Sequence, residues 1–260
     1  MASPRILFAG DRAIAVRVLR FLLEQKCIPE ALVTAEGPEA SHAKELRQLV
    51  DGLLPEGRIF SASAIRTEEG KQLLKELRPD YIIGIHFPYL IPPAILHIPK
   101  RGFINLHPAF LPFNRGWHTP SWAIVDGTPY GATLHFMAEK IDAGDILAQK
   151  KLDVLPEDTG DSLYQRALDL EYKVFTDFWP RLVTGSYTPI PQDETRATAH
   201  AKKDLAQVQY INLEQEVPAR ELIDKLRALT TNDAKEAAYF VKGGKRYQVR
   251  ISLTKESDES

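Results

Sequence analysis

Asn105 and His107 stand two residues apart at the end of an apolar run, residues 103–106. Alternate side chains of an extended chain point to the same face, so these two side chains should share one face. An acid, Asp142 or Asp145, follows downstream in a loop that contains Gly144, and we expect its carboxylate to fold back onto His107. An amide, an imidazole and a carboxylate together make a set of groups suited to acyl transfer.

Each of these residues also has a plain structural interpretation. Considered alone, Asn105 can be interpreted as a residue at a strand end that caps a turn. His107 considered alone can be interpreted as a hydrogen-bonded core histidine. Asp142 can be a loop acid facing water, and Asp145 is a second candidate for the acid. His135, in the middle of a predicted strand, is interpreted as a core side chain. The run Pro108, 111–112 and 115–116 directly after His107 favours a functional site for the combination.

Composition sets the broad class of the protein. The chain has 260 residues, of which 44% are hydrophobic, enough for one substantial domain and a small one. A formal net charge of −2 argues against a nucleic-acid partner, which usually requires a basic face. The single cysteine, Cys27, cannot form an intramolecular disulfide, which fits a reducing compartment. No signal core or membrane-spanning run is present, so we expect a cytoplasmic protein without membrane contact.

Strand patterns alternate with helix patterns over the first half of the chain. The expected strands are residues 5–9, 30–34, 58–61, 80–85 and 102–106, and the expected helices are 13–23, 43–49 and 67–77. This alternation predicts an α/β fold with a doubly wound, mostly parallel, Rossmann-like sheet and helices on both faces.

The pattern changes after residue 129. Two strands, 130–137 and 145–154, form a predicted hairpin whose long loop, 138–144, suggests a role beyond turning the chain. A helix begins at about residue 160 and is expected to stop near Pro180. We therefore predict a catalytic domain over 1–185.

The remaining residues, 186–260, form a predicted small α+β tail. A linker-like crossing begins at residue 187, a helix is expected over 216–229, and a hairpin over 239–241 and 246–251 turns at a Gly-Gly pair.

Ligands of open α/β sheets bind outside the carboxyl ends of the strands, which is where Asn105 and His107 lie. The glycine spacing of a dinucleotide-binding loop is absent after the first strand, and no cluster of Cys and His has the spacing of a metal site.

The pattern Asn105-x-His107-Pro108-x-x-Leu111-Pro112, with a later Asp142-x-Gly144, resembles the folate-dependent formyltransferases, including the catalytic domain of methionyl-tRNA formyltransferases. The resemblance covers essentially the whole first domain. It implies 10-formyltetrahydrofolate as the formyl donor and attack of a substrate amine on the formyl carbon. Asn105 would then donate to the developing oxyanion, His107 would move the amine proton, and Asp142 would orient His107 and support its charged form.

The resemblance also implies two binding regions. The folate pocket would be formed by a segment after the strand 80–85 and by the hairpin loop, with Phe87, Tyr89, Leu90, Ile91, Ala138 and Ile141 as candidates. Backbone groups of the segment would pair with the edge of the pterin. The acceptor would lie near Gly10, Arg12, Phe110, Arg115, Gly116 and Trp117. Arg12 is equally well explained as a solvated arginine.

Members of this family act on three classes of acceptor, and the three classes of enzyme differ in the segment that follows the long helix. Glycinamide ribonucleotide formyltransferases end soon after the long helix, and methionyl-tRNA formyltransferases have a longer, basic C-terminal domain. The segments 198–205, 226–230 and 238–240 resemble the sugar N-formyltransferases, from which 231–236 departs. The resemblance implies a dTDP-linked 3- or 4-amino deoxysugar as acceptor, a product used in surface polysaccharide such as lipopolysaccharide O-antigen, and a homodimer. The alternatives are another acceptor amine, a formyltetrahydrofolate hydrolase, and a non-catalytic binding module.

Overall fold

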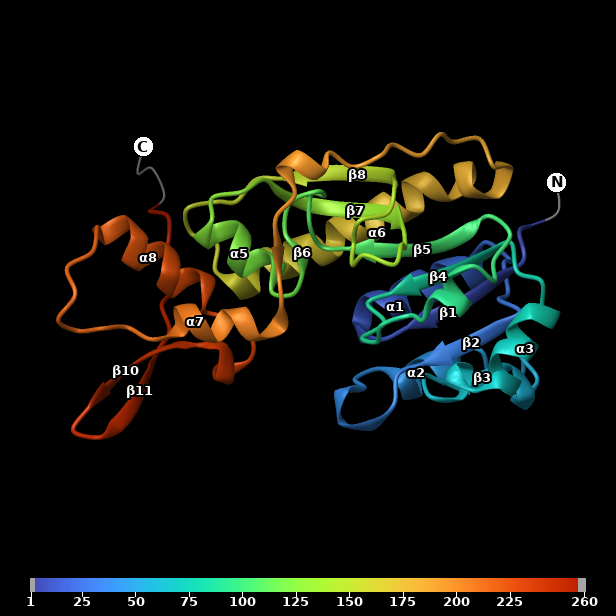
Figure 1. The fold of residues 1–260 in the computed structure, drawn as a ribbon, viewed down its shortest axis with the longest axis horizontal. Helices are drawn as coiled ribbons and strands as arrows, with labels where there is room; N and C mark the ends of the chain where they lie inside the picture. The colour runs from blue at the N-terminus through green and yellow to red at the C-terminus, as the bar shows by residue number, and fades with distance from the viewer. Residues whose placement is uncertain (1–2, 257–260) are drawn as a thin grey trace. The chain divides into compact units, whose positions relative to one another are not determined.

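A seven-stranded sheet forms the centre of the fold in the computed structural model, which describes residues 3–256 (Figure 1). The strand order is β3-β2-β1-β4-β5-β7-β8. The strands are β1 (Ile6–Gly10), β2 (Ala31–Thr34), β3 (Ile59–Ser61), β4 (Tyr81–Ile85), β5 (Gly102–His107), β7 (Tyr130–Phe136) and β8 (Ile146–Leu152). The first five are mutually parallel, and β7 runs antiparallel to β5. The predicted α/β fold with a mostly parallel sheet is confirmed.

The helices follow the strands in alternation. They are α1 (Arg12–Glu24), α2 (Ala43–Leu49), α3 (Glu68–Glu76), α4 (Pro93–Leu96), α5 (Thr119–Val125), α6 (Gly160–Thr184), α7 (Leu205–Gln209) and α8 (Ala219–Ala228). Every residue of β1, β2 and β4 is buried, as expected for central parallel strands covered by helices on both faces. No helix within residues 3–256 is long and apolar enough to cross a bilayer.

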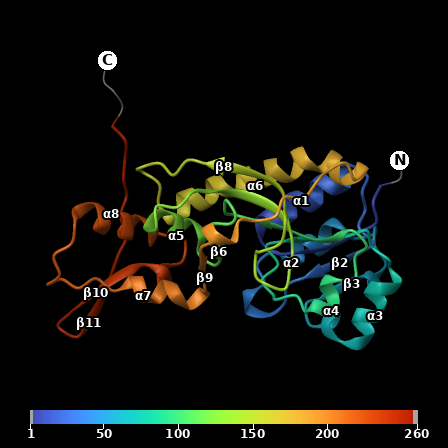
Figure 2. The ribbon, with the colours of Figure 1, turned by 45° about the horizontal axis from the view of Figure 1, so that its top comes forward.

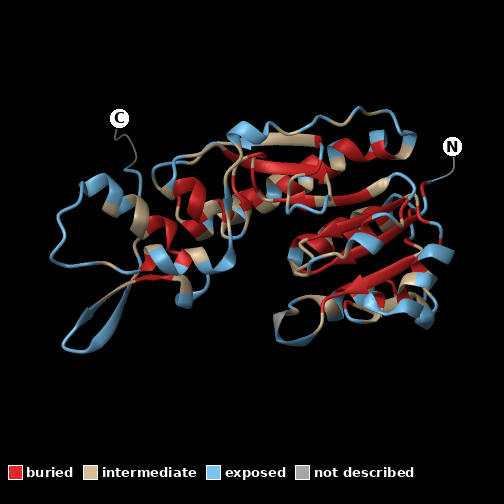
Figure 3. Cartoon of the chain, in the orientation of Figure 1, coloured by how far each residue is buried: buried red, intermediate tan, exposed pale blue. Residues whose placement is uncertain are grey.

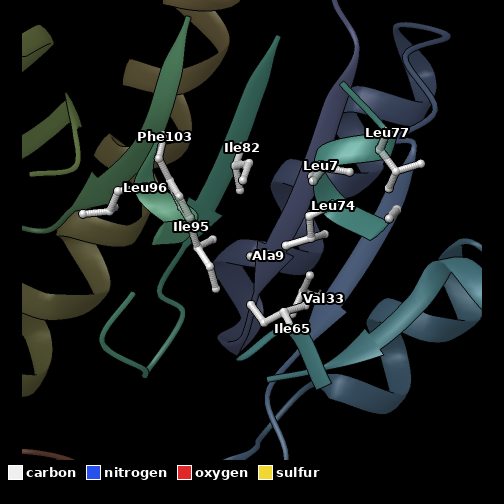
Figure 4. Close-up of a cluster of buried hydrophobic side chains, with 11 residues drawn as sticks. Leu7, Ala9, Val33, Ile65, Leu74, Leu77, Ile82, Ile95, Leu96 and Phe103 are labelled. Atoms are coloured by element: carbon white, nitrogen blue, oxygen red, sulfur yellow. The ribbon is translucent and has the colours of Figure 1, made fainter. Parts of the chain in front are cut away.

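One face of the sheet packs against α3, α4 and the turn that precedes α3 (Figure 4). The apolar side chains of this layer come from alternate strand positions, since alternate residues share a face. The cluster consists of Leu7, Ala9, Ala31, Val33, Ile65, Leu74, Leu77, Ile82, Ile95, Leu96 and Phe103. Burial of this layer fixes the segment between β4 and β5, which lies next to the candidate site.

The helices α1 and α6 lie side by side (Figure 2). An aromatic cluster joins them. The ring of Phe21 meets three rings of α6 edge-on, with centroid distances of 6.2–6.5 Å; they belong to Tyr172, Phe175 and Trp179. The prediction that this helix stops near Pro180 was wrong, because α6 continues to Thr184. A proline removes one N–H from the helix, and this single loss lies close to the end of a 25-residue helix.

Close contacts divide the chain into two compact units. The first consists of Met1–His107, Thr133–Gln149 and Glu171–Gln192, and the second of Pro108–Ala132, Lys150–Leu170 and Asp193–Ser260. The domain boundary at residue 185 stays a prediction, and the last four residues of the predicted tail lie outside the described range.

The second unit is built around α5. Ala123 and Ile124 pack with residues of β7, α6 and α8, and Trp122 packs with Leu205 of α7 and with β10 (Ala238–Lys242). A hairpin of β10 and β11 (Lys245–Val249) ends this unit, and most of its residues are exposed (Figure 3). The predicted helix over 216–229 is observed as α8. Its first turn is missing because Pro218 precedes the helix.

Gly70 offers a stability test, because a methyl group there has no room. An added Cβ would lie 2.1 Å from the carbonyl oxygen of Ala64. A glycine-to-alanine change inside a helix normally stabilises a protein by roughly 0.5–1 kcal/mol. We predict the opposite for Gly70→Ala, a loss of about 1–3 kcal/mol, since the packed turn must move. Urea unfolding of the variant and the wild type measures this change in the free energy of unfolding.

Gly57→Ala is the matched control. Nothing lies within 4 Å of a Cβ at Gly57, so its unfolding free energy should stay close to that of the wild type. A Gly70→Ala variant more stable than the wild type would contradict the packing described for α3.

Candidate active site

Two side chains at the carboxyl end of β5 form the base of the site. Asn105 and His107 share one face of the strand, and the His107 side chain is 8% exposed. On one side β5 pairs with β4, and on the other with β7, whose antiparallel register places His135 directly beside Asn105. The pairing therefore adds a second imidazole to the two groups that the sequence brings together.

The carboxylate of Asp142 reaches both imidazoles. Its Oδ2 lies 3.6 Å from Nε2 of His107, and its Oδ1 lies 3.7 Å from Nε2 of His135. The Asp142 side chain is 12% exposed, whereas Asp145 is an exposed residue. Asp142, and not Asp145, is thus the acid of this loop that lies close to His107.

His135 holds Asn105 in a defined orientation. Its Nδ1 lies 2.8 Å from the carbonyl oxygen of Phe136, which can only accept, so Nδ1 carries a proton. In the neutral ring Nε2 then accepts a hydrogen bond from Nδ2 of Asn105 at 3.2 Å. The Asn105 amide nitrogen keeps a second N–H, which is free to meet an oxyanion.

The sequence interpretation of His135 as a core side chain was incomplete. The ring is fully buried, but it lies against Asn105 and near Asp142. Its position opposite Asn105 follows from the hairpin register, and residue type and burial alone do not reveal it.

The loop that carries Asp142 is tied to the sheet at both ends. The N–H of Met137 donates to the Phe103 carbonyl at 2.6 Å, and that of Phe136 to the Asp145 carbonyl at 2.9 Å. A Cβ at Gly144 would lie 1.9 Å from the Phe136 oxygen, so only glycine fits there. The backbone of Asp142 is left-handed, with φ = 50°.

A donor N–H, an imidazole and a carboxylate thus converge within the first unit. Such a set can stabilise an oxyanion, move a proton and orient the proton carrier. Within residues 3–256 no group of three or more His, Cys, Asp and Glu side chains is arranged to hold a metal ion.

Comparison with known proteins assigns the family. Residues 19–178 match the model of the formyl transferase family, and residues 204–255 match the N-formyltransferase dimerization C-terminal domain. The chain belongs to the formyl transferase family. The prediction of a formyltransferase family member is confirmed.

Two curated relatives show the range of the family. The chain is 32% identical over 198 residues to a methionyl-tRNA formyltransferase of Geobacillus sp. (strain WCH70), a match that covers 75% of this chain and 62% of the relative. It is 30% identical over 179 residues to a dTDP-4-amino-4,6-dideoxyglucose formyltransferase of Mycobacterium tuberculosis (strain ATCC 25618 / H37Rv), covering 69% of this chain and 75% of the relative.

Solved structures share the fold over nearly the whole chain. A Mycobacterium tuberculosis protein assigned as a sugar N-formyltransferase has a TM-score of 0.78 and 25% identity, with 98% of this chain and 99% of that chain covered. An N-formyltransferase from Helicobacter canadensis, solved with folinic acid and dTDP-3-aminofucose, has a TM-score of 0.64 and 17% identity, with 93% and 85% covered.

The predicted folate segment of this formyltransferase follows β4 and is fastened by polar contacts. The hydroxyl of Tyr89 donates to the Glu36 carbonyl at 2.7 Å, and Arg66 donates to the Leu90 carbonyl at 2.9 Å. Phe87 and Ile91 pack against the buried cluster of the sheet. The Leu90 side chain is 72% exposed.

A cavity of about 340 Å³ opens beside the amino end of β5 in the first unit. Apolar side chains at its wall include Leu96, Phe103, Phe136 and Met137, and the predicted folate residue Ala138 also lines it. Ile141 is exposed and is not part of this lining, and neither is the segment 87–91.

A buried contact between His86 and Glu171 precedes the predicted folate segment, and no pattern in the sequence indicated it. Nε2 of His86 lies 2.8 Å from Oε1 of Glu171, whose side chain is fully buried. His86 has a left-handed backbone, with φ = 48°, at the end of β4. This contact fixes the backbone at His86, where the chain leaves β4 and continues into the segment 87–91.

Gly10 and Arg12 lie at the end of β1 in the first unit. A Cβ at Gly10 would meet the Cβ of Ala15 at 2.8 Å, so the glycine allows α1 to pack closely. The Arg12 side chain is 43% exposed and lies 3.7 Å from the carboxylate of Asp11. Asp11 is buried and accepts hydrogen bonds from Ser41 and from the N–H of His42, which fixes the loop after β2.

The other predicted acceptor residues belong to the second unit. The guanidinium of Arg115 is 2% exposed and forms a bidentate pair with Glu194, with nitrogen–oxygen distances of 2.5 and 3.2 Å. Gly116 lies in β6 (Arg115–Gly116), where a Cβ would meet the His200 oxygen at 2.3 Å. These contacts give Arg115 and Gly116 structural roles.

Phe110 and Trp117 differ from these two residues. Phe110 is half-buried, and Trp117 is 39% exposed with Nζ of Lys202 4.9 Å from its ring centroid. Trp122 stacks on His200 at 3.8 Å between ring centroids and is buried, in agreement with its interpretation as a structural residue. Trp117 is the predicted acceptor residue of this unit whose side chain is most open to a ligand.

Proposed function

We propose that this chain transfers a formyl group from 10-formyltetrahydrofolate to the amine of a nucleotide-linked amino deoxysugar, with dTDP as the nucleotide. The observation that supports the reaction type is the convergence of Asn105, His107 and Asp142, with His135 as an orienting neighbour. The family match and the M. tuberculosis dTDP-4-amino-4,6-dideoxyglucose formyltransferase support the chemistry.

In the proposed reaction the acceptor amine attacks the formyl carbon. A bond forms between the amine nitrogen and that carbon, and the carbonyl oxygen takes up negative charge. The remaining N–H of Asn105 donates to this oxyanion, which in comparable sites lowers the barrier by about 3–4 kcal/mol.

Proton transfer completes the exchange. His107 accepts a proton from the attacking amine and delivers a proton to N10 of the folate as the bond between carbon and N10 breaks. Asp142 orients the imidazole and stabilises it while it is charged. The products are the formamido sugar and tetrahydrofolate.

The fastened segment 87–91, which follows the carboxyl end of β4, supports binding of the folate in the first unit. The apolar side chains of this segment, Phe87 and Ile91 among them, suit a flat heterocycle. The cavity that Ala138 lines is at the amino end of β5, away from Asn105 and His107, and we do not assign it to the folate.

The second unit supports the sugar acceptor over methionyl-tRNA. Residues 204–255 match the dimerization domain of N-formyltransferases, and the net charge of the chain is −2. A tRNA acceptor would require a positively charged face.

The dimerization match also supports a homodimer. Large apolar side chains are exposed in this segment, as expected for a surface covered by a second copy; they are Tyr210, Leu213, Val217, Ile223, Val241 and Tyr247. We expect light scattering to give twice the chain mass of 29.3 kDa at micromolar concentration. A mass of one chain at all concentrations would exclude the dimer.

The acceptor is tested by direct assay. The full chain is incubated with 10-formyltetrahydrofolate and, separately, dTDP-linked 3- and 4-amino deoxysugars, glycinamide ribonucleotide, methionyl-tRNA or buffer. We expect mass spectrometry to find one formyl group on an amino sugar. Formate release at the same rate in buffer alone would instead indicate a hydrolase, and formylation of the tRNA would overturn the sugar assignment.

Asn105→Ala tests the oxyanion donor. Loss of the N–H should lower kcat about 10²–10³-fold, because the donor acts on the oxyanion of the transition state. Steady-state kinetics with the acceptor that is formylated fastest in the preceding assay measures kcat. Asn212→Ala, at an exposed asparagine of the second unit, is the control and should keep wild-type turnover. Equal kcat for Asn105→Ala and wild type would remove the proposed mechanism.

A further inference from the structure

The chain between α6 and the second unit returns along the outer edge of the sheet (Figure 1). Ile190 exchanges two hydrogen bonds with Ile146 of β8, both 2.8 Å long, which forms an antiparallel bridge. Pro189 and Pro191 flank Ile190 and carry no backbone N–H, so Ile190 is the one residue of this tripeptide that can donate to the strand. The crossing segment, residues 187–192, is therefore held in a single register.

Tyr187 anchors the beginning of the crossing segment. Its hydroxyl lies 2.7 Å from the hydroxyl of Tyr81, and its ring contacts Phe136 and Phe178. Burial, together with the hydrogen bond to Tyr81, raises the pKa of the Tyr187 phenol well above its ordinary value. Fixed at Tyr187 and at Ile190, the segment delivers Gln192 to a defined place.

Gln192 meets the loop that carries the acid of the candidate site. Its Nε2 donates to the carbonyl oxygen of Asp142 at 2.8 Å and to that of Gly144 at 2.6 Å. An amide nitrogen carries two hydrogens, so one side chain satisfies both carbonyls. These carbonyls lie on either side of Ala143, at the point where the loop turns back to β8.

The conformation of this turn needs outside support. Asp142 has φ = 50°, a left-handed conformation that is uncommon for residues other than glycine, although aspartate adopts it more readily than most. The residues before it, 138–141, are exposed. Strained backbone of this kind persists when the surrounding structure fixes it.

We propose that Gln192 is a positioning residue for formyl transfer, which holds Asp142 within reach of His107. The inference rests on the proposed function. Gln192 does not touch the reacting atoms; it acts by fixing the two carbonyls that determine where the Asp142 carboxylate lies. Since the Asp142 contacts to His107 and His135 are 3.6 and 3.7 Å, a small displacement of the loop breaks both.

Gln192→Met is the test variant, because methionine matches glutamine in length and volume and carries no donor. We expect kcat to fall about 10–100-fold, since misplacing a catalytic group by about 1 Å can cost 10²-fold. KM for the acceptor should change less than about twofold, because Asp142 is not a proposed acceptor ligand.

A second series separates positioning from general damage. In an Asp142→Asn background, where the carboxylate is already lost, Gln192→Met should lower kcat no more than about twofold further, because both changes act through one group. Gln149→Met is the matched control: Gln149 lies on β8 and donates to Thr133 at 3.4 Å. It should leave kcat within about twofold of the wild type.

Hydrogen exchange gives a readout that does not depend on turnover. Amides of residues 138–145 should exchange faster in Gln192→Met than in the wild type or in Gln149→Met, while the thermal unfolding midpoints of the two variants stay alike. The positioning role would be overturned if Gln192→Met left the exchange rates or kcat unchanged. It would also be overturned if Gln192→Met lowered kcat by the same factor in the Asp142→Asn background as in the wild type. A wild-type chain that formylates no acceptor, yet shows faster exchange in Gln192→Met, would contradict the proposed function and leave the loop contact in place.

Discussion

The antiparallel pairing of β5 with β7 is the contact on which the candidate site depends. The parallel strands present Asn105 and His107 at one edge of the sheet, but a carboxylate far along the chain must still be brought to them. Pairing Asn105 with His135 places a ring that orients the amide, and it starts the loop that returns with Asp142. A shift of this register by one residue would turn His135 to the opposite face and remove both effects.

The sequence predicted the parallel sheet well because its buried strands are continuous apolar runs between helical patterns. From the two-residue period of a strand and a glycine-containing loop, it also predicted that Asn105 and His107 would share a face and that an acid of the loop would meet His107. The family resemblance selected Asp142 over Asp145. It did not predict the role of His135, because a histidine in a buried strand has the same local pattern whether it packs in a core or orients an amide. The pairing of Arg115 with Glu194 was missed for a related reason, since 78 residues separate them in the chain.

Most of the structural features that could not be predicted from the sequence are polar contacts between residues far apart in the chain. Asp11 fixes the loop at residues 41–42, Glu171 holds His86, and Glu36 holds Tyr89 through backbone atoms. None of these pairs has a spacing that a helix or strand period would reveal. Each lies at the carboxyl edge of the sheet or in a segment that leaves it, where loops have to be fixed by side chains because no ladder of backbone hydrogen bonds is present.

The path of the chain after α6 bears on how such enzymes could be recombined. A junction at residue 185, which composition alone suggests, would exchange the crossing segment along with the tail and would separate the loop from its amide donor. A junction after residue 192 keeps that donor with the catalytic sheet and also coincides with the end of the first compact unit. Grafts of foreign tails onto this scaffold should therefore begin at Asp193.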